Sequence, residues 1–190
     1  MRELIVTENI TIDGVIDAAE GWFAPGGDDD ADQSDVLDAL REQREAADAL
    51  LLGRVTFEQM RGYWPLQTDD TTGIADYLDN VAKYVVSTTL KEPDWARTTV
   101  LEGPLVEEVR ALKSSPGADI VTTGSMMLTS DLIGAGLVDE YRLFVYPVVI
   151  GRGHRLFTDA IGVPGLQLEE TRPFASGIVL LRYRTTPPKS

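Results

Sequence analysis

The stretch that decides the fold is residues 49–65, which read ALLLGRVTFEQMRGYWP. Its apolar start, Ala49–Leu52, predicts a buried strand, and residues 56–63 predict a short helix. Gly53 and Arg54 lie between the two, at the carboxyl end of the strand. Amide N–H groups at the start of a helix attract anions and a guanidinium matches a phosphate, so we interpret the junction as an anion site. A tight strand–helix turn with a solvated arginine is an equally compatible interpretation of so short a pattern.

Outward from this junction, apolar periodicity predicts alternating strands and helices. The expected strands are residues 2–8, 83–87, 98–101, 119–123, 140–150, 166–171 and 178–184. The expected helices are residues 34–47, 73–81, 104–113 and 125–133. This order predicts an α/β sheet that is parallel for most of its width and has an antiparallel C-terminal edge. We expect a single domain over residues 1–184 and a frayed tail at 185–190.

The composition restricts the kinds of function. The chain has 190 residues, no cysteine and one histidine, which excludes thiolate catalysis and argues against a transition-metal site. The formal net charge is −14, whereas nucleic acids and anionic membranes bind surfaces rich in Lys and Arg, so neither is an expected partner. Residues 1–9 alternate apolar and polar side chains and lack the apolar stretch of a signal peptide. The longest nearly apolar run, residues 143–150, is too short to span a membrane, so a cytoplasmic protein is expected.

Two other strand ends carry residues that suit an anionic ligand. Gly124 and Ser125 repeat the order of strand, glycine and helix start. Ser87, Thr88 and Thr89 place hydroxyl groups after a third strand. Because ligands of an open α/β sheet bind at the carboxyl ends of strands, the three ends together predict one extended anionic ligand, with phosphates on backbone N–H groups. Taken singly, the glycine turn is equally compatible with an ordinary helix cap, and the hydroxyl-bearing segment is more typical of a loop.

Weaker candidates follow the first strand. Asp13 precedes Gly14, so it is either a turn residue or a carboxylate at the carboxyl edge of the sheet, and the two interpretations weigh equally. Trp22 and Phe23 lie in a loop rich in Gly and Asp, where they either close over a planar substrate or pack locally. The three aspartates at residues 28–30 are more typical of a solvated loop than of a metal site.

Several motifs occur in an order and at intervals typical of one protein family. They are IDGV (12–15), LLGRVTFE (51–58), KYVVS (83–87), GS (124–125), GLVDEYRL (136–143) and YPVVIGRG (146–153). Through these motifs the chain resembles, from residue 2 to residue 184, the dihydrofolate-reductase-like family that includes the reductase domain of the bifunctional riboflavin-biosynthesis deaminase/reductase. It is most similar to the small stand-alone bacterial and archaeal members.

The resemblance implies a three-layer fold, with a central mixed sheet of about eight strands flanked by helices. It also implies a homodimer, and NADPH bound along the strand ends beside a small-molecule substrate. The residues that would contact NADPH are Gly53, Arg54 and Thr56 at the adenosine-side phosphates, Ser87, Thr88 and Thr89 near the adenosine, and Gly124, Ser125 and Met126 near the pyrophosphate. Arg54 would then bind the 2′-phosphate that distinguishes NADPH from NADH.

The resemblance leaves open which group protonates the substrate. The folate-reducing branch uses a carboxylate early in the helix after its first loop, for which Asp35 is a candidate and Asp32 a rival. The riboflavin branch shares the element that contains Asp13, which is the second candidate. The substrate of that branch carries a phosphate, for which Arg152 and Arg155 are candidate partners.

We therefore predict an NADPH-dependent reductase of the riboflavin-pathway type that acts on a small heterocycle with a carbonyl or imine group. The alternatives are a dihydrofolate or pterin reductase and a non-catalytic protein that binds a nucleotide as a sensor or scaffold. An ionisable group near the nicotinamide separates these alternatives. The binding protein is favoured if Asp13 and Asp35 both point away from the cleft.

Overall fold

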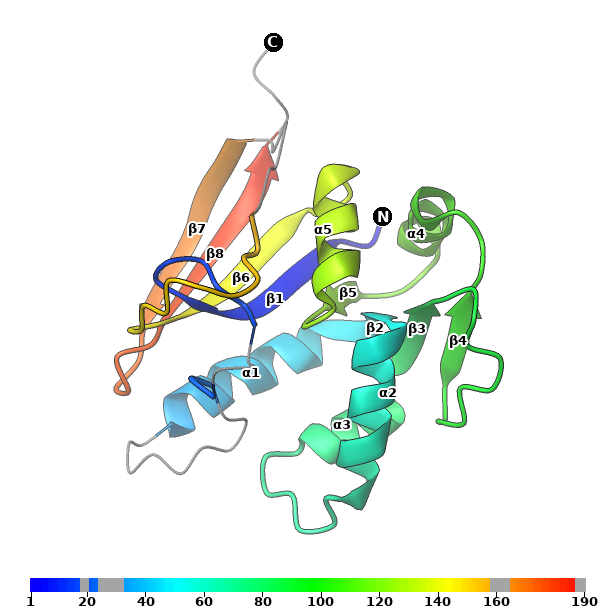
Figure 1. Cartoon of the computed structure of the whole chain (residues 1–190), viewed down its shortest axis with the longest axis horizontal. Helices are drawn as coiled ribbons and strands as arrows, with labels where there is room; N and C mark the ends of the chain where they lie inside the picture. Colours follow the sequence, from blue (N-terminus) through cyan, green and yellow to red (C-terminus); the bar gives the residue numbers. More distant parts are fainter. Residues whose placement is uncertain (18–20, 24–32, 158–164, 187–190) are drawn as a thin grey trace.

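The computed structural model of the chain describes residues 1–17, 21–23, 33–157 and 165–186. These residues form one sheet of eight strands in the order β4-β3-β2-β5-β1-β6-β8-β7, with helices on both faces (Figure 1). The strands are β1 (Leu4–Thr11), β2 (Ala47–Gly53), β3 (Ala82–Val86), β4 (Thr98–Leu101), β5 (Asp119–Thr122), β6 (Glu140–Tyr146), β7 (Gly165–Pro173) and β8 (Val179–Thr186). The helices are α1 (Ser34–Ala46), α2 (Arg54–Tyr63), the 3-10 turn η2 (Trp64–Leu66), α3 (Ile74–Asn80), α4 (Leu105–Ser114) and α5 (Met126–Gly134). Among these described helices, none has the length and apolar content needed to cross a bilayer.

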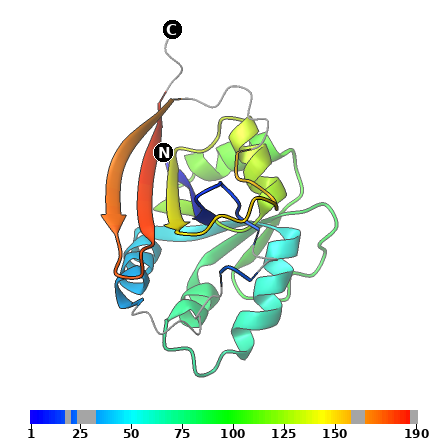
Figure 2. The same ribbon diagram turned by 60° about the vertical axis from the view of Figure 1, so that its left-hand side comes forward.

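Strand direction divides the sheet into two parts. From β4 through β3, β2, β5 and β1 to β6, every neighbouring pair is parallel. At the other edge β8 pairs antiparallel with both β6 and β7. In Figure 2, β6 is yellow, β7 is orange and β8 is red. The predicted α/β sheet, mostly parallel with an antiparallel C-terminal edge, is confirmed. Because parallel strands end at the same edge, the segments that follow β1, β2, β3 and β5 are brought to one side of the molecule.

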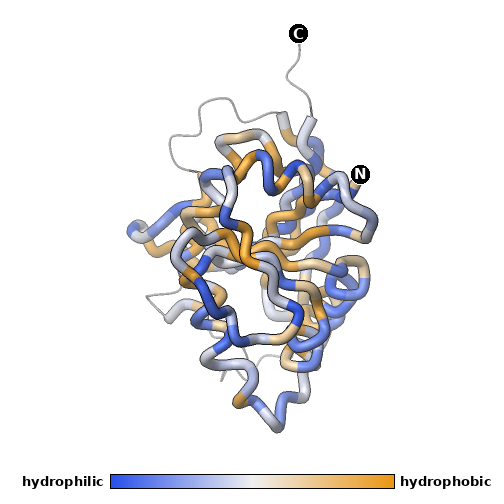
Figure 3. The backbone as a smooth tube through the Cα atoms, turned by 90° about the vertical axis from the view of Figure 1, so that its right-hand side faces the viewer, coloured by the Kyte–Doolittle hydropathy of each residue, from blue (hydrophilic) through white to orange (hydrophobic). Residues whose placement is uncertain are grey.

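Apolar side chains on both faces of the sheet bury its central strands. Along β2, Leu50 and Leu52 belong to the cluster that α2 and α3 complete, whereas Ala49 and Leu51 belong to the cluster that α4 and α5 complete. This alternation is the geometry of a strand covered on both faces. Apolar segments accordingly gather in the middle of the molecule (Figure 3). The fully buried Phe57 of α2 anchors that helix to the sheet directly after β2.

The strand predicted over residues 140–150 is shorter in the structure. β6 ends at Tyr146, because Pro147 has no N–H to donate to a sheet ladder. The Val148 amide instead donates to the Tyr146 carbonyl over 2.7 Å, which turns the chain. The predicted C-terminal end of this strand, Ile150, is therefore wrong, because the strand ends at Tyr146.

The frayed tail predicted at residues 185–190 begins two residues too early, because the last strand ends at Thr186. β8 continues to Thr186, and the Thr185 amide donates to the Asp139 carbonyl over 2.9 Å. Thr185 and Thr186 thus belong to the sheet, because the last strand is paired to its end. Residues 187–190 lie outside the described part of the chain.

Candidate functional site

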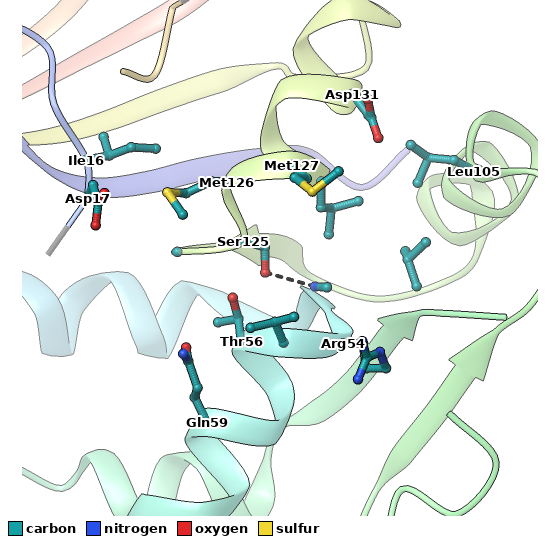
Figure 4. Close-up of a pocket in the computed structure, with 15 residues that line it drawn as sticks. Ile16, Asp17, Arg54, Thr56, Gln59, Leu105, Ser125, Met126, Met127 and Asp131 are labelled. Carbon is teal, nitrogen blue, oxygen red and sulfur yellow. Dashed lines mark hydrogen bonds between the residues drawn. The ribbon is translucent and has the colours of Figure 1, made fainter. Parts of the chain in front are cut away.

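A cavity of about 740 Å³ lies at the carboxyl edge of the sheet, between the starts of α2 and α5 (Figure 4). Its volume falls in the range of about 300–1,000 Å³ that is typical of small-molecule and cofactor sites. The residues that line it are Ile16, Asp17, Gly53, Arg54, Val55, Thr56, Gln59, Val86, Leu105, Gly124, Ser125, Met126, Met127, Leu128 and Asp131. The structure therefore brings together six of the residues predicted to contact a cofactor: Gly53, Arg54, Thr56, Gly124, Ser125 and Met126.

Helix α2 begins at Arg54, directly after β2 and earlier than the predicted start at Thr56. Thr56 lies in the first turn of the helix, and Gly53 occupies the N-cap position. Because Phe57 is buried in the core, Arg54, Val55 and Thr56 are left to line the cavity. The amides of a first helical turn have no intrahelical acceptor, so their N–H groups are suited to an anion.

The two glycine junctions pack against each other. The Gly53 amide donates a hydrogen bond to Ser125 Oγ over 2.8 Å, the dashed line in Figure 4. Gly124 has a φ of +72°, and a Cβ at this position would lie 3.3 Å from Thr56 Cγ2. Position 124 therefore requires glycine for both its backbone conformation and its contact with the other junction.

A buried glutamate holds the amide of Gly124. Glu8 of β1 is only 4% exposed, and its Oε1 accepts a hydrogen bond from the Gly124 N–H over 2.8 Å. Burial raises the pKa of Glu8 to about 8, although the bond from the Gly124 amide acts in the opposite direction. The amides of Gly53 and Gly124 are thus both engaged within the protein. A phosphate at these junctions would therefore meet other N–H groups of the helix starts, and the contact of Gly53 and Gly124 with a cofactor stays a prediction.

Arg54 supplies positive charge to the cavity. Its Nη1 lies 3.2 and 3.0 Å from the two carboxylate oxygens of Glu58, one turn further along α2. Both side chains are partly exposed, so this is a weak surface ion pair. Nε and Nη2 carry the other N–H donors of the planar guanidinium. Of the described residues that line the cavity, Arg54 is the only lysine or arginine.

The hydroxyl groups after β3 build a turn beside the cavity. Ser87 Oγ accepts hydrogen bonds from the amides of Thr89 and Leu90, over 3.1 and 3.0 Å. Thr88 and Thr89 are exposed, whereas Val86 at the end of β3 lines the cavity. Contact of the adenosine with this turn stays a prediction.

Asp13 belongs to a turn outside the cavity lining. Its Oδ1 accepts a hydrogen bond from Thr11 Oγ1 over 2.7 Å, and its Oδ2 accepts one from the Gly151 amide over 2.7 Å. These hydrogen bonds, with that of Thr11 the largest, lower the pKa of Asp13 to about 2. At neutral pH the carboxylate therefore has no proton to donate. The structure places Asp13 in a turn, where its carboxylate holds two backbone segments together, and the catalytic role of Asp13 stays a prediction.

Asp35 joins the start of α1 to the turn between β7 and β8. Its Oδ1 accepts a hydrogen bond from the Val36 amide over 2.9 Å, and its Oδ2 accepts one from the Ala175 amide over 2.8 Å. Asp35 does not line the cavity. Its catalytic role stays a prediction, and its rival Asp32 lies outside the described residues. Asp13 and Asp35 thus do not decide between the reductase and the nucleotide-binding alternative, because two other carboxylates, Asp17 and Asp131, line the cavity.

Trp22 and Phe23 pack on Tyr146, the last residue of β6. The Trp22 and Tyr146 ring centroids are 5.3 Å apart, and those of Phe23 and Tyr146 are 5.7 Å apart. Both rings are half-buried in this cluster, and neither lines the cavity. Tyr146 provides a local core for the two rings that the sequence did not reveal, and their contact with a substrate stays a prediction.

Two carboxylates that line the cavity, Asp17 and Asp131, were missed by the sequence analysis. Asp17 follows the turn after β1, and Asp131 lies on α5 (Figure 4). The position of Asp17 depends on an isolated antiparallel bridge between Val15 and Arg155, a pairing of distant segments that no local pattern reveals. The signal available in the sequence was an aspartate closely following a strand of the ligand-binding edge.

Comparisons with known proteins agree with this architecture. Residues 2–180 match the family described as the RibD C-terminal domain. The uncharacterized protein YyaP of Bacillus subtilis is 34% identical over 187 residues, which cover 96% of this chain and 94% of YyaP.

Solved structures share the fold. A putative riboflavin biosynthesis protein from Shewanella sp. PV-4 has a TM-score of 0.70 at 18% identity, and the match covers 97% of this chain and 99% of that one. A dihydrofolate reductase from Enterococcus faecalis, in complex with NADP(H) and RAB-propyl, has a TM-score of 0.63 at 19% identity, with 97% of each chain covered. The predicted dihydrofolate-reductase-like fold is therefore confirmed.

Proposed function

Since the chain belongs to the RibD C-terminal domain family, we propose that it is an NADPH-dependent reductase of the riboflavin-biosynthesis type. The reaction transfers a hydride to a carbonyl or imine carbon of a small heterocyclic substrate and a proton to the neighbouring heteroatom, with NADP⁺ as the other product. The observation that carries this proposal is the cavity, where a guanidinium and two helix starts form a cationic edge in a chain of net charge −14.

The residues of the cavity suit the phosphates of NADPH. Arg54 offers the planar fork that matches a phosphate monoester. The first turns of α2 and α5 offer amide N–H groups at the positive ends of two helix dipoles. We assign the 2′-phosphate to Arg54 and the pyrophosphate to the amides of Met126 and Met127. The bound cofactor supplies the hydride, and the protein fixes its orientation.

Apolar side chains line the end of the cavity opposite Arg54, where a bound cofactor and substrate would displace water. Ile16 and Met126 lie near each other there and both line the wall (Figure 4). A site from which water is excluded strengthens polar interactions with the substrate and suppresses side reactions. Asp17 follows Ile16 along the chain, so it is the carboxylate closest to this end.

The family resemblance also supports a cytoplasmic homodimer, and we propose the dimer on that ground alone. Sedimentation velocity of the purified chain separates a dimer from the 20.8 kDa monomer. A single species at the monomer mass over the micromolar range would contradict the assembly without affecting the cofactor assignment.

Titration with NADPH and NADH, followed by the fluorescence of the reduced nicotinamide, tests the cofactor assignment. Arg54→Ala is expected to weaken NADPH by about 1–3 kcal/mol, the worth of a charge-assisted hydrogen bond, and to leave NADH nearly unchanged. Arg41→Ala removes an exposed arginine of α1 and is the matched control. Equal weakening of both cofactors by Arg54→Ala would contradict the 2′-phosphate assignment, and no binding of either cofactor would refute the proposed function.

NADPH oxidation in the presence of the riboflavin precursor or of dihydrofolate tests the reaction. Turnover of the riboflavin precursor supports the proposed type, and turnover of dihydrofolate alone supports a folate reductase. NADPH binding without turnover of either compound supports the nucleotide-binding alternative or a reductase with a different substrate.

A further inference from the structure

A buried carboxyl group lies behind the wall of the cavity, under the start of α5. Glu8 is 4% exposed and is not among the residues that line the cavity. Its Oε1 accepts a hydrogen bond from the amide of Gly124, which does line it. The proposed function places the pyrophosphate of the cofactor on the amides of Met126 and Met127, which follow Gly124 in the chain. The role inferred for Glu8 rests on that assignment.

The surroundings of Glu8 are apolar. Val6 and Ile10 share its face of β1 and belong to the cluster that α4 and α5 complete. Leu143, its partner on β6, belongs to the same cluster. The pKa of Glu8 is about 8, because burial raises it further than the hydrogen bond from Gly124 lowers it, and no charged side chain of the described residues contributes. An ionised Glu8 therefore carries a negative charge that no neighbouring cation offsets.

Glu8 fixes the turn that joins the two helix starts. An added Cβ at Gly124 would lie 3.3 Å from Thr56 Cγ2, so this turn packs against the first turn of α2. The next residue, Ser125, accepts the Gly53 amide at its Oγ over 2.8 Å, and Thr56 and Ser125 lie close together at this part of the wall (Figure 4). The hydrogen bond between Gly124 and Glu8 thus orients the turn from which α5 begins.

Other titratable and charged groups face this cluster or the cavity from the elements around Glu8. Tyr141 of β6 has a pKa that burial raises to about 12, so it stays neutral where Glu8 titrates. Lys113 of α4 pairs with Asp139 beside the Leu4 amide, at the other end of β1. The remaining groups among the described residues are Tyr84 and Tyr183 against the cluster and Asp17, Arg54 and Asp131 at the cavity. A Glu8→Gln variant keeps all of these groups, so its comparison with the wild-type protein isolates Glu8.

We propose that Glu8 is a positioning residue that holds the Gly124 turn for the cofactor in its neutral, protonated form, and that ionisation of Glu8 opposes binding of the pyrophosphate. Like charges repel, and the repulsion is larger where little water screens them. A neutral carboxyl group still accepts the Gly124 amide and adds no charge behind the phosphates. Cofactor affinity is then full below about pH 8 and falls as the pH rises through the pKa of Glu8. Because such coupling is reciprocal, a bound pyrophosphate raises the pKa of Glu8.

Fluorescence titration with NADPH between about pH 7 and pH 10 tests the coupling. Over this range the Kd of the wild-type protein is expected to rise about tenfold more than that of Glu8→Gln, which corresponds to a pKa raised by about one unit on binding. At pH 7 the two proteins are expected to bind NADPH alike, because a glutamine oxygen accepts the same amide. Glu45→Gln, which removes an exposed carboxylate of α1, is the matched control and is expected to follow the wild-type protein. Equal pH dependence in the wild-type protein and Glu8→Gln overturns the coupling and leaves the cofactor assignment standing.

NADH tests where in the cavity the coupling acts, because it shares the pyrophosphate with NADPH and lacks the 2′-phosphate. Its Kd is expected to depend on pH through Glu8 in the same way. A dependence confined to NADPH overturns the proposal, because the opposing charge would then act at the 2′-phosphate assigned to Arg54.

The ¹³C chemical shift of the Glu8 carboxyl group, identified by its absence in Glu8→Gln, reports the ionisation of Glu8 without any measurement of activity. Saturation with NADPH, or with inorganic pyrophosphate as a smaller probe, is expected to raise the pKa of Glu8 by about one unit. An unchanged or lowered pKa overturns the proposal. If the protein binds neither NADPH nor NADH, the proposed function is refuted and pyrophosphate alone decides the coupling. A pKa of Glu8 that pyrophosphate raises then supports the coupling, and an unchanged pKa or no binding of pyrophosphate overturns it.

Discussion

Replacement of Glu8 by glutamine removes a buried titratable group and keeps the contact that it makes. Glu8 is 4% exposed, and its Oε1 accepts the Gly124 amide over 2.8 Å. A glutamine oxygen accepts the same hydrogen bond, and its NH₂ group takes the place of the carboxylic O–H. Glu8→Gln therefore mimics the protonated side chain at every pH.

The expected effect on stability follows from the raised pKa of Glu8. The pKa of this carboxyl group is about 8 in the folded chain against an ordinary value of 4.5, so the folded state holds the proton more tightly than the unfolded state does. The wild-type protein then has its full stability below about pH 4.5 and loses stability as the pH rises toward 8. At about 1.4 kcal/mol per pH unit, the loss relative to Glu8→Gln reaches about 3 kcal/mol at pH 7.

Urea unfolding of the wild-type protein and Glu8→Gln at several pH values between 4.5 and 8.5 measures this loss. The difference in free energy of unfolding is expected to grow with pH in favour of Glu8→Gln and to level off above about pH 8. Glu45→Gln, at an exposed position of α1, makes the same change of charge without burial and should show little pH-dependent difference. Parallel stability curves for the wild-type protein and Glu8→Gln would refute the reasoning, because they would mean that Glu8 ionises alike in both states.

Two further changes test the junctions and turns around the cavity. Ser125→Ala is expected to lower the free energy of unfolding by about 1–3 kcal/mol in urea, because the Gly53 amide loses its acceptor. Ser114→Ala, at an exposed serine of α4, is the control. Equal destabilisation by the two substitutions would contradict the role of the Ser125 hydroxyl. Asp13→Asn is expected to make stability less dependent on pH in acid. Because the pKa of Asp13 is lowered to about 2, the stabilisation that Asp13 provides is complete above about pH 4 and is lost as the pH falls toward 2. Urea midpoints that decline equally in Asp13→Asn and the wild-type protein over this range would contradict this prediction.

Local patterns determined most of the elements of this protein. The apolar run before Gly53 predicted β2, and the spacing of apolar residues after Gly53 predicted α2. A strand places alternate side chains on one face and a helix every third or fourth, so both patterns can be recognised within one segment of sequence. The same is true of the junction at Gly124, whose strand, glycine and helix start follow one another in the sequence. The motifs also predicted that the residues of both junctions serve one site, and both line the same cavity.

The partners of individual side chains were decided only by the tertiary structure. Asp13 and Asp35 were expected at a ligand, but their carboxylates accept hydrogen bonds from the amides of Gly151 and Ala175, which are distant in the sequence. Local propensity does not specify such pairs, because they form only when the strand order has placed the segments together.

The charge pattern of the cavity has the same origin. The arginine at position 54 was evident from its place between a strand and a helix, whereas the opposing Asp17 reaches the cavity because β1 lies next to β5 in the sheet and Val15 pairs with Arg155. The sequence by itself thus determined the class of fold and the two glycine junctions that line the cavity. The tertiary structure alone decided which carboxylate lies at the other end, because that depends on contacts between segments far apart in the chain.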